Sequence, residues 1–227
     1  MTAVYPAGML LLALACSGPD KTLDAETTST EHTGADGEAC PPWAGLELGT
    51  ELTWSTTSEY VGSSGTSMTK TRTVVSHEDW EQGGTLVRTE GSFVSVEFRG
   101  DRRTSTSTET YGCNDDGAFL LTRAVESAFI SNGTTTQHRY EAVFEEYRVM
   151  SWTPEDGWYS EFDQTITNAS GSFWDPGDFE VVFTGEGERT TPAGTFATLG
   201  LSFNGFLHHY SAGVGLVETS TLWLVSQ

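Results

Sequence analysis

Basic residues are scarce in this sequence. Its 227 residues include 11 Lys and Arg but 32 Asp and Glu, which gives a formal net charge of −21 at pH 7. Proteins that bind nucleic acids neutralise phosphates with clustered Lys and Arg, so this balance excludes a general nucleic-acid binder. We interpret the acidic excess as a feature that keeps an exported surface soluble through mutual repulsion.

Long apolar runs are also lacking, apart from one at residues 7–15. A run of this length is far below the roughly 18 residues that span a bilayer. It fits the apolar core of a secretory signal peptide, and the small residues Ala13 and Ala15 on either side of Leu14 form an acceptable cleavage pattern. The sequence therefore predicts a signal peptide over residues 1–15 and export from the cytosol.

Cys16 stands immediately after this cleavage pattern and is followed by Ser17 and Gly18. The arrangement resembles the lipobox of bacterial lipoproteins, although Ala13 takes the place of the usual leucine and no Lys or Arg precedes the apolar run. The resemblance implies that the Cys16 thiol receives a diacylglyceryl group. Cys16 would then anchor the chain to a membrane of the bacterial cell envelope, by expectation the outer membrane. Ordinary cleavage after Ala15, which leaves a free thiol, is the alternative.

Cysteine is rare, with three residues in the whole chain. If Cys16 carries lipid, Cys40 and Cys113 remain, and an even number of cysteines in an oxidising compartment favours a disulfide between them. In the chain-entropy model, a bridge that closes so long a loop stabilises a fold by roughly 4 kcal/mol. The alternative is two separate buried thiols.

Residues 16–40 are rich in Thr, Ser, Gly, Asp and Glu and contain almost no large apolar side chain. Such a segment cannot bury enough surface to offset the entropy lost on ordering, so we expect a disordered acidic tether after the lipidated cysteine. The composition changes at Pro41, and we expect a single domain over residues 41–227.

Apolar and polar residues alternate through this domain, which is the pattern of strands with one buried face. Asn-Gly pairs at 132–133 and 204–205 indicate hairpins between such strands. We therefore predict an all-β fold of about ten antiparallel strands, either in one large curved sheet (a half-barrel) or in a two-sheet sandwich. The alternating runs include residues 94–98, 140–144, 179–183 and 199–203.

Two local predictions concern the middle of the domain. Residues 123–129 are the segment in which we expect a helix. Threonines at every second position from Thr104 to Thr110 share one face of a strand, and we interpret this strand as a polar edge that discourages pairing with other chains.

Four local patterns follow one another at residues 48–54, 113–121, 191–196 and 210–218, and the last two read Thr-Pro-Ala-Gly-Thr-Phe and Tyr-Ser-Ala-Gly-Val-Gly-Leu-Val-Glu. Their order resembles a group of uncharacterised bacterial exported proteins and lipoproteins, with alanine at 212 where proline is common and glutamate at 218 where lysine is common. The resemblance implies an antiparallel sheet curved into a half-barrel, similar to periplasmic lipoprotein carriers. It implies no activity.

Motifs typical of catalysis or metal binding are weak. Ser67 and Lys70 match the Ser-x-x-Lys of penicillin-binding enzymes, but they lie in a β-biased run that would place them on opposite faces of a strand. His208 and His209 should also face opposite sides, one toward solvent and one beside Tyr210. We assign no catalytic, cofactor-binding or metal-binding residue and expect a protein that is not an enzyme.

Two functions are compatible with these features. The first is a binding module whose curved apolar face holds a hydrophobic or lipid ligand, which the 7 Trp and 12 Phe favour. The alternative is a structural or protein-interaction lipoprotein of the envelope that binds no small ligand. In both cases the predicted contact with the membrane is the lipid at Cys16.

We predict that Cys16→Ser abolishes metabolic labelling of the protein by a fatty-acid analogue, because the lipid is attached through the thiol. Labelling is measured by in-gel fluorescence after immunoprecipitation from cells, with Ser17→Ala as the control that keeps the label. Label retained on the Cys16→Ser protein would contradict the predicted anchor.

Overall fold

Residues 39–97 and 100–227 are described by the computed structural model, and most of them lie in strands. The predicted signal peptide, Cys16 and nearly all of the predicted tether lie outside these ranges. The elements in chain order are η1 (Pro42–Ala44), β1 (Glu51–Thr56), α1 (Ser58–Ser64), β2 (Thr66–Asp79), β3 (Thr85–Glu97), β4 (Arg102–Asn114), β5 (Gly117–Ser131), β6 (Thr134–Glu145), β7 (Arg148–Met150), η2 (Pro154–Asp156), β8 (Trp158–Asn168), β9 (Gly171–Thr191), β10 (Gly194–Phe203), β11 (Phe206–Ser211), β12 (Gly215–Thr219) and β13 (Leu222–Ser226).

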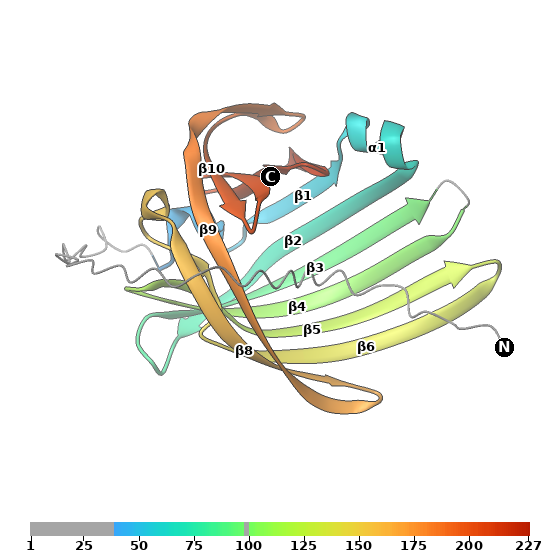
Figure 1. The fold of residues 1–227 in the computed structure, drawn as a ribbon, viewed down its shortest axis with the longest axis horizontal. Helices are drawn as coiled ribbons and strands as arrows, with labels where there is room; N and C mark the ends of the chain where they lie inside the picture. Colours follow the sequence, from blue (N-terminus) through green and yellow to red (C-terminus); the bar gives the residue numbers. More distant parts are fainter. Residues whose placement is uncertain (1–38, 98–99) are drawn as a thin grey trace, which may run out of the picture. The chain divides into compact units, whose positions relative to one another are not determined.

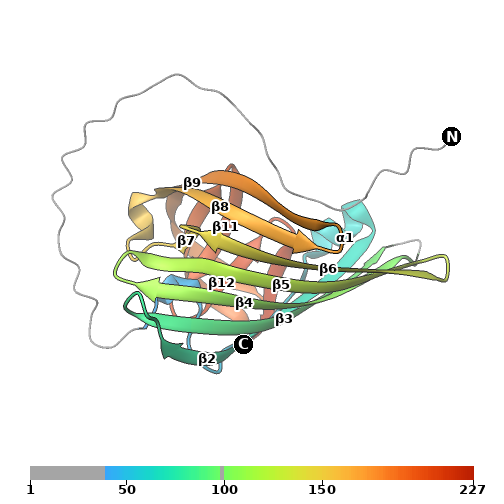
Figure 2. The ribbon, with the colours of Figure 1, turned by 90° about the horizontal axis from the view of Figure 1, so that it is seen from below.

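The strands form one continuous antiparallel sheet that closes on itself (Figures 1 and 2). The order of neighbours runs from β4 through β3, β2, β1, β13, β12, β11, β10, β9, β8 and β6 to β5, and β5 pairs in turn with β4. The result is a barrel of twelve strands, with the short strand β7 beside β5. The all-β prediction is confirmed, but the sheet closes further than a half-barrel, it is not divided into a sandwich, and the described residues form thirteen strands rather than about ten.

Short turns connect many of these strands, as the Asn-Gly pairs predict. Asn132 and Gly133 join β5 to β6 with φ of 50° and 76°, and Asn204 and Gly205 join β10 to β11 with φ of 47° and 88°. Positive φ at both central residues defines the two-residue hairpin turn whose twist matches that of the strands.

One end of the barrel is filled by an apolar core. The segment from Cys40 to Leu46, which we call the plug, belongs to this core and contacts β7, β11 and β12. Cys40 is bonded to Cys113 on β4, with the two Cα atoms 5.1 Å apart, so the predicted disulfide is present. The buried core residues around the plug include Val87, Tyr111, Leu120, Met150, Trp158 and Leu201.

The plug fits tightly against the turn between β11 and β12. A Cβ atom added to Gly45 would lie 2.2 Å from the carbonyl oxygen of Val214, and one added to Gly215 would lie 2.9 Å from Cα of Gly45. His77 fixes the far end of the plug, since its Nε2 lies 2.7 Å from the Leu46 carbonyl oxygen. The closed end is therefore held by a covalent bond, by hydrogen bonds and by close backbone contact.

A second, smaller core lies where the tip of the β9–β10 hairpin meets β1 and β13. Leu52, Trp54 and Leu224 are buried there, and Phe196 packs against them. The indole N–H of Trp54 donates to the carbonyl of Leu216 at 2.9 Å. On the other side of the barrel, the long strands β2–β6 extend beyond the short strands β11–β13 (Figure 1).

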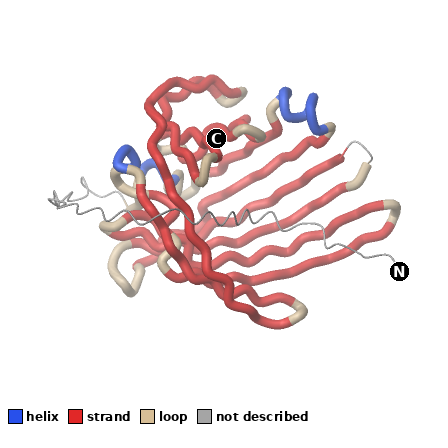
Figure 3. The backbone as a smooth tube through the Cα atoms, in the orientation of Figure 1, coloured by secondary structure: helices blue, strands red, loops and turns tan. Residues whose placement is uncertain are grey.

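Two local predictions were wrong. Residues 123–129 lie in β5 rather than in a helix (Figure 3). They pair with β4 on one side and β6 on the other, which places alternate side chains inside and outside the barrel. Thr104–Thr110 lie on β4, which is not an edge, since it pairs with β3 on one side and β5 on the other.

The α-helix in the described ranges is α1. It follows Thr57, whose side chain accepts a hydrogen bond from the backbone N–H of Tyr60. In this part of the chain, no helix has the length and apolarity needed to cross a membrane.

Candidate functional site

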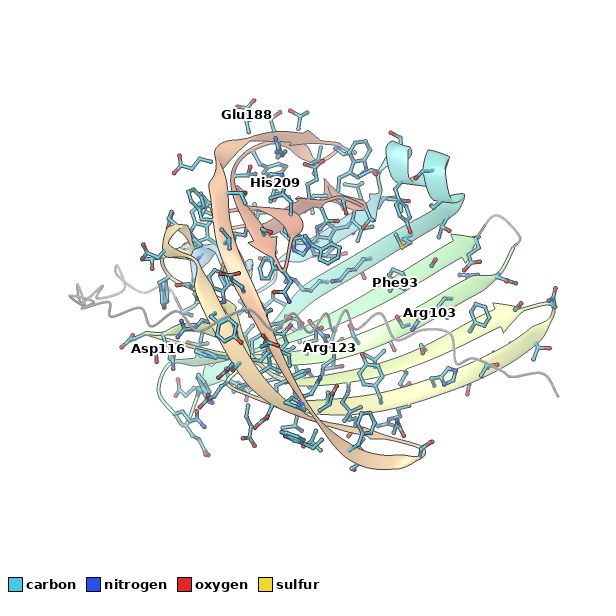
Figure 4. The ribbon with its side chains drawn as sticks, in the orientation of Figure 1. Phe93, Arg103, Asp116, Arg123, Glu188 and His209 are labelled. Atoms are coloured by element: carbon cyan, nitrogen blue, oxygen red, sulfur yellow. A yellow bond between two sulfur atoms is a disulfide. The ribbon has the colours of Figure 1, made fainter. Side chains whose placement is uncertain are left out.

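Strand register shows which side chains face the inside of the barrel. Cross-strand partners share a face, and side chains along one strand alternate between faces. Val74 on β2 is a buried core residue, so Arg72 and Lys70 on the same face of β2 also point inward. The register continues across β3 to Glu109 on β4 and then to Arg123 on β5, which is labelled in Figure 4. We call Lys70, Arg72, Glu109 and Arg123 the interior charge cluster.

Glu109 and Arg123 form an ion pair across β4 and β5. Nε of Arg123 lies 2.7 Å from Oε1 of Glu109, and the hydroxyl of Tyr111 donates a hydrogen bond to Oε2 of the same carboxylate. Burial by itself raises the pKa of Glu109, but Arg123, Tyr111 and Lys70 outweigh it and leave that pKa below its usual value. Glu109 is therefore ionised, and Arg123 is its direct partner.

Lys70 has no such partner. In the described ranges, its Nζ is not part of an ion pair or hydrogen bond and lies 5.6 Å from the centroid of the Trp54 ring. Burial lowers the pKa of Lys70 below its ordinary value; Glu109 opposes this effect, and Arg72 and Arg123 add to it. The side chain is nevertheless exposed to water. A charged group that is surrounded by protein and still exposed lies in a solvent-accessible interior.

Arg72 joins the interior charge cluster to the plug. One of its terminal nitrogens donates to the carbonyl of Gly45 at 2.7 Å, and its guanidinium carbon lies 5.7 Å from the centroid of the Trp54 ring. Its Nε is buried and has no hydrogen-bond partner among the described residues. Arg72 therefore holds the plug, and it forms no ion pair with a carboxylate in the part of the chain that the structure describes.

The interior charge cluster thus has three cations and one carboxylate, in a chain whose net charge is −21. A charge inside a protein loses much of its hydration and needs a partner or residual water to compensate. The interior charge cluster therefore carries a formal excess of positive charge inside a negative protein.

Aromatic rings form a continuous layer next to the interior charge cluster. Tyr147 stacks on Phe162 with centroids 4.3 Å apart, and Phe203 stacks on His208 at 5.1 Å. Burial, followed by the proximity of His209 and Lys70, lowers the pKa of His208, which favours the neutral form of its ring. The layer consists of Phe144, Tyr147, Trp158, Phe162, Phe179, Phe203, His208 and Tyr210.

Several inward side chains that neighbour the interior charge cluster on β3, β4 and β5 are small. Gly91 on β3 is registered with Ser107 on β4, and Ser105 on β4 is registered with Ser127 on β5. Eight-stranded barrels are about filled by their own side chains, whereas barrels of 16 or more strands leave a channel. A twelve-stranded barrel with short inward side chains therefore keeps free space inside.

Apolar rings line the same free space without being covered. Phe129 on β5 and Phe173 on β9 face inward but remain 38% and 42% exposed. Phe93 on β3 and Arg103 on β4 lie on the same inner wall (Figure 4). The hollow therefore combines a cationic region with uncovered aromatic surface.

Carboxylates are concentrated on the outer surface instead. Tyr159 is one of the exposed residues there, and the hydrogen bond from its hydroxyl to Asp178 raises its pKa to about 12. An open hollow at this place is lined by Glu145, Glu146, Glu161, Asp163 and Asp178. Carboxylates thus dominate this part of the outer surface, whereas cations outnumber carboxylates in the interior charge cluster.

The structure places the residues singled out from the sequence as follows. Cys16 lies outside the described residues, and Cys40 and Cys113 are joined at the closed end. Ser67 and Lys70 point to opposite faces of β2, as predicted, so they cannot act together.

His208 and His209 also face opposite sides, and His208 lies beside Tyr210 as predicted. His209 is buried rather than exposed, which corrects the prediction that one ring faces solvent. A terminal nitrogen of Arg189 donates to Nε2 of His209 at 2.9 Å, while Nε of Arg189 lies 3.2 Å from Glu218 (His209 is labelled in Figure 4). Burial and Arg189 lower the pKa of His209, which is consistent with a neutral ring.

The interior charge cluster was not predicted from the sequence. Its members come from β2, β4 and β5, so their proximity depends on the register of the closed sheet. One signal was present: Lys70 and Arg72 are two residues apart and share a strand face with the apolar residue Val74. Charged residues at positions where the alternation predicts inward-facing apolar side chains indicate a polar interior.

Within residues 39–97 and 100–227, no group of three or more His, Cys, Asp or Glu side chains is arranged to hold a metal ion. Comparisons of the chain with family models, with curated proteins and with solved structures found no match.

We predict that Glu109→Gln lowers the free energy of unfolding by about 2 kcal/mol, because it leaves the Arg123 guanidinium unpaired. Breaking a fully buried pair costs roughly 3 kcal/mol or more, and the effect is smaller here because the Arg123 side chain is 36% exposed. Urea denaturation at pH 7 measures it. Glu90→Gln removes the exposed Arg88–Glu90 pair and is the control, with a change of at most about 0.5 kcal/mol.

The difference in unfolding free energy between the wild type and Glu109→Gln depends on pH in a defined way. The pKa of Glu109 is lower in the folded state than in the unfolded state. The carboxylate therefore contributes its full share of the free energy of unfolding above the unfolded-state pKa of about 4.3. This contribution is lost as the pH falls through the folded-state pKa. The stabilities of wild type and Glu109→Gln should converge in acid. A difference that persists unchanged in acid would contradict the ion pair.

Proposed function

We propose that the protein is a cell-envelope lipoprotein whose barrel binds a hydrophobic or lipid ligand without catalysing a reaction. The observation that supports this most strongly is the uncovered aromatic surface of Phe129 and Phe173 on the inner face of the barrel. Apolar surface inside a closed sheet is stable when something apolar covers it. The chain itself leaves this surface free in the described ranges.

The closed end supports the same proposal. The plug, the disulfide between Cys40 and Cys113 and the apolar core fill that end, so that the free space forms a cup rather than a channel. Ligand pockets combine apolar walls with a few polar groups that fix orientation. Uncovered rings next to the interior charge cluster meet this description.

The interior groups favour binding over catalysis. Glu109 is held by Arg123 and Tyr111, and His208 is neutral and stacked on Phe203. A catalytic acid or base needs access to a reacting atom and a pKa suited to proton transfer near the working pH. The arrangement of these residues instead holds fixed charges in place.

The membrane anchor in this proposal is the lipid expected at Cys16, which would keep the barrel at the cell envelope after export. A barrel tethered in this way meets lipids or lipidated partners at high local concentration. The ligand would enter from the end of the barrel opposite the plug.

A second candidate is a structural or protein-interaction lipoprotein without a small ligand. It is favoured by apolar side chains on the outer face: Val182 and Leu207 flank Ser202 across β9, β10 and β11 and are 46% and 43% exposed. Crosslinking in intact cells followed by purification distinguishes this candidate, because it requires a protein partner that contacts this outer patch.

We predict that native mass spectrometry of the full-length protein, purified from its own membranes in mild detergent, shows a bound small molecule. Ser107→Trp should reduce this occupancy at least tenfold, because the indole fills the space beside Gly91. Thr106→Trp, one residue away on the outer face of β4, is the control and should keep the ligand. Circular dichroism verifies that both variants fold.

A homogeneous ligand-free mass for the wild type, with no change in tryptophan fluorescence when lipids are added, would contradict the proposed function. Equal occupancy in Ser107→Trp and the wild type would place the ligand outside the barrel.

A further inference from the structure

Among the cations of the interior charge cluster, Lys70 is the one that forms neither an ion pair nor a hydrogen bond within the described residues. The carboxylate of the interior charge cluster, Glu109, is already bound by Arg123 at 2.7 Å and by the Tyr111 hydroxyl. Asp175 is another inward carboxylate, and it accepts a hydrogen bond from Gln164 instead. The Lys70 ammonium faces the ring of Trp54, and the side chain is otherwise exposed.

The Lys70 side chain is exposed, so its ammonium is accessible to a ligand from inside the barrel. Lys70 is opposite Phe93, Phe93 is opposite Ser105, and Ser105 is opposite Ser127, so these four residues form one row across β2–β5. An apolar ring and two short hydroxyl side chains thus follow the cation along the wall. Their size leaves room for a group with hydrogen-bond acceptors next to Nζ.

The next row, further from the plug, combines apolar side chains with a second inward cation. Met68 is opposite Ser95, Ser95 is opposite Arg103, and Arg103 is opposite Phe129. From the plug outward, the wall therefore presents Arg72, then Lys70 beside the half-buried ring of Phe93, and then the exposed ring of Phe129 beside Arg103. An amphiphile whose polar end enters first matches this order.

We infer that the ligand is an anionic amphiphile, whose carboxylate, phosphate or sulfate binds the ammonium of Lys70 and whose apolar chain lies along Phe93 and Phe129. This inference rests on the proposed function and specifies the chemistry of its ligand. Arg72 and Arg123 strengthen the local positive potential without giving up their own partners. An uncharged lipid would leave the Lys70 charge uncompensated.

The acidic exterior makes this selection meaningful. With a net charge of −21, the chain attracts cationic amphiphiles to its surface. Retention of an anionic amphiphile therefore requires a specific cation inside the barrel, and general attraction cannot produce it.

The test measures the tryptophan fluorescence of the delipidated full-length protein during titration with four probes. The probes are oleate, oleoyl lysophosphatidate, oleyl alcohol and inorganic phosphate. We expect one or both acidic amphiphiles to bind at least tenfold more tightly than oleyl alcohol, and inorganic phosphate to bind far more weakly than either. Lys70→Met should remove the preference for the acid, while oleyl alcohol binding stays unchanged. Lys70→Arg should retain the preference, and Arg88→Met on the outer surface is the matched control.

Each other outcome has a definite meaning. Equal binding of acids and oleyl alcohol would overturn this inference while leaving the proposed function intact. Binding of inorganic phosphate as tightly as oleate would also overturn it, because the site would then recognise a free anion. Binding of none of the four probes would contradict the proposed function itself. An acid preference that survives in a folded Lys70→Met protein would show that another cation selects the ligand.

Discussion

The closure of the sheet through the pairing of β4 with β5 is the constraint on which the rest of the structure depends. Closure satisfies the backbone groups that an open edge would expose. It also fixes a circumference of twelve strands, which encloses more volume than the inward side chains fill. The plug, bound through Cys40 and Cys113, fills one end, and short residues such as Gly91 and Ser107 leave the remaining space open.

Closure also brings together charges that are far apart in the sequence. Lys70 and Arg72 on β2 lie near the Glu109–Arg123 pair of β4 and β5 because all three strands curve around the same space. The ion pair stabilises the inner wall, and Arg72 stabilises the plug through the Gly45 carbonyl. Lys70 has neither role, which is why we connect it with a ligand rather than with the stability of the barrel.

Local features of the fold were predictable, and its non-local features were not. Alternation predicted the inward faces of Tyr140, Phe144 and Val181, and the Asn-Gly pairs predicted two hairpins. The same alternation was misleading at the open end, where Val96 faces outward and Phe93 inward, because a hollow interior does not require a continuous apolar face. Ring closure and the interior charge cluster depend on cross-strand register, which one strand's sequence does not contain.

The most direct test of this account is the pKa of Lys70, measured by NMR on protein whose lysines carry ¹³C-methyl groups. The chain has two lysines, and the Lys70→Met variant assigns the signals. We predict that Lys70 titrates below its ordinary pKa in the ligand-free protein, because burial and the charges of Arg72 and Arg123 outweigh Glu109. An anionic amphiphile should raise that pKa, whereas oleyl alcohol should not. A Lys70 signal that titrates as in the urea-unfolded chain, with or without ligand, would contradict the account.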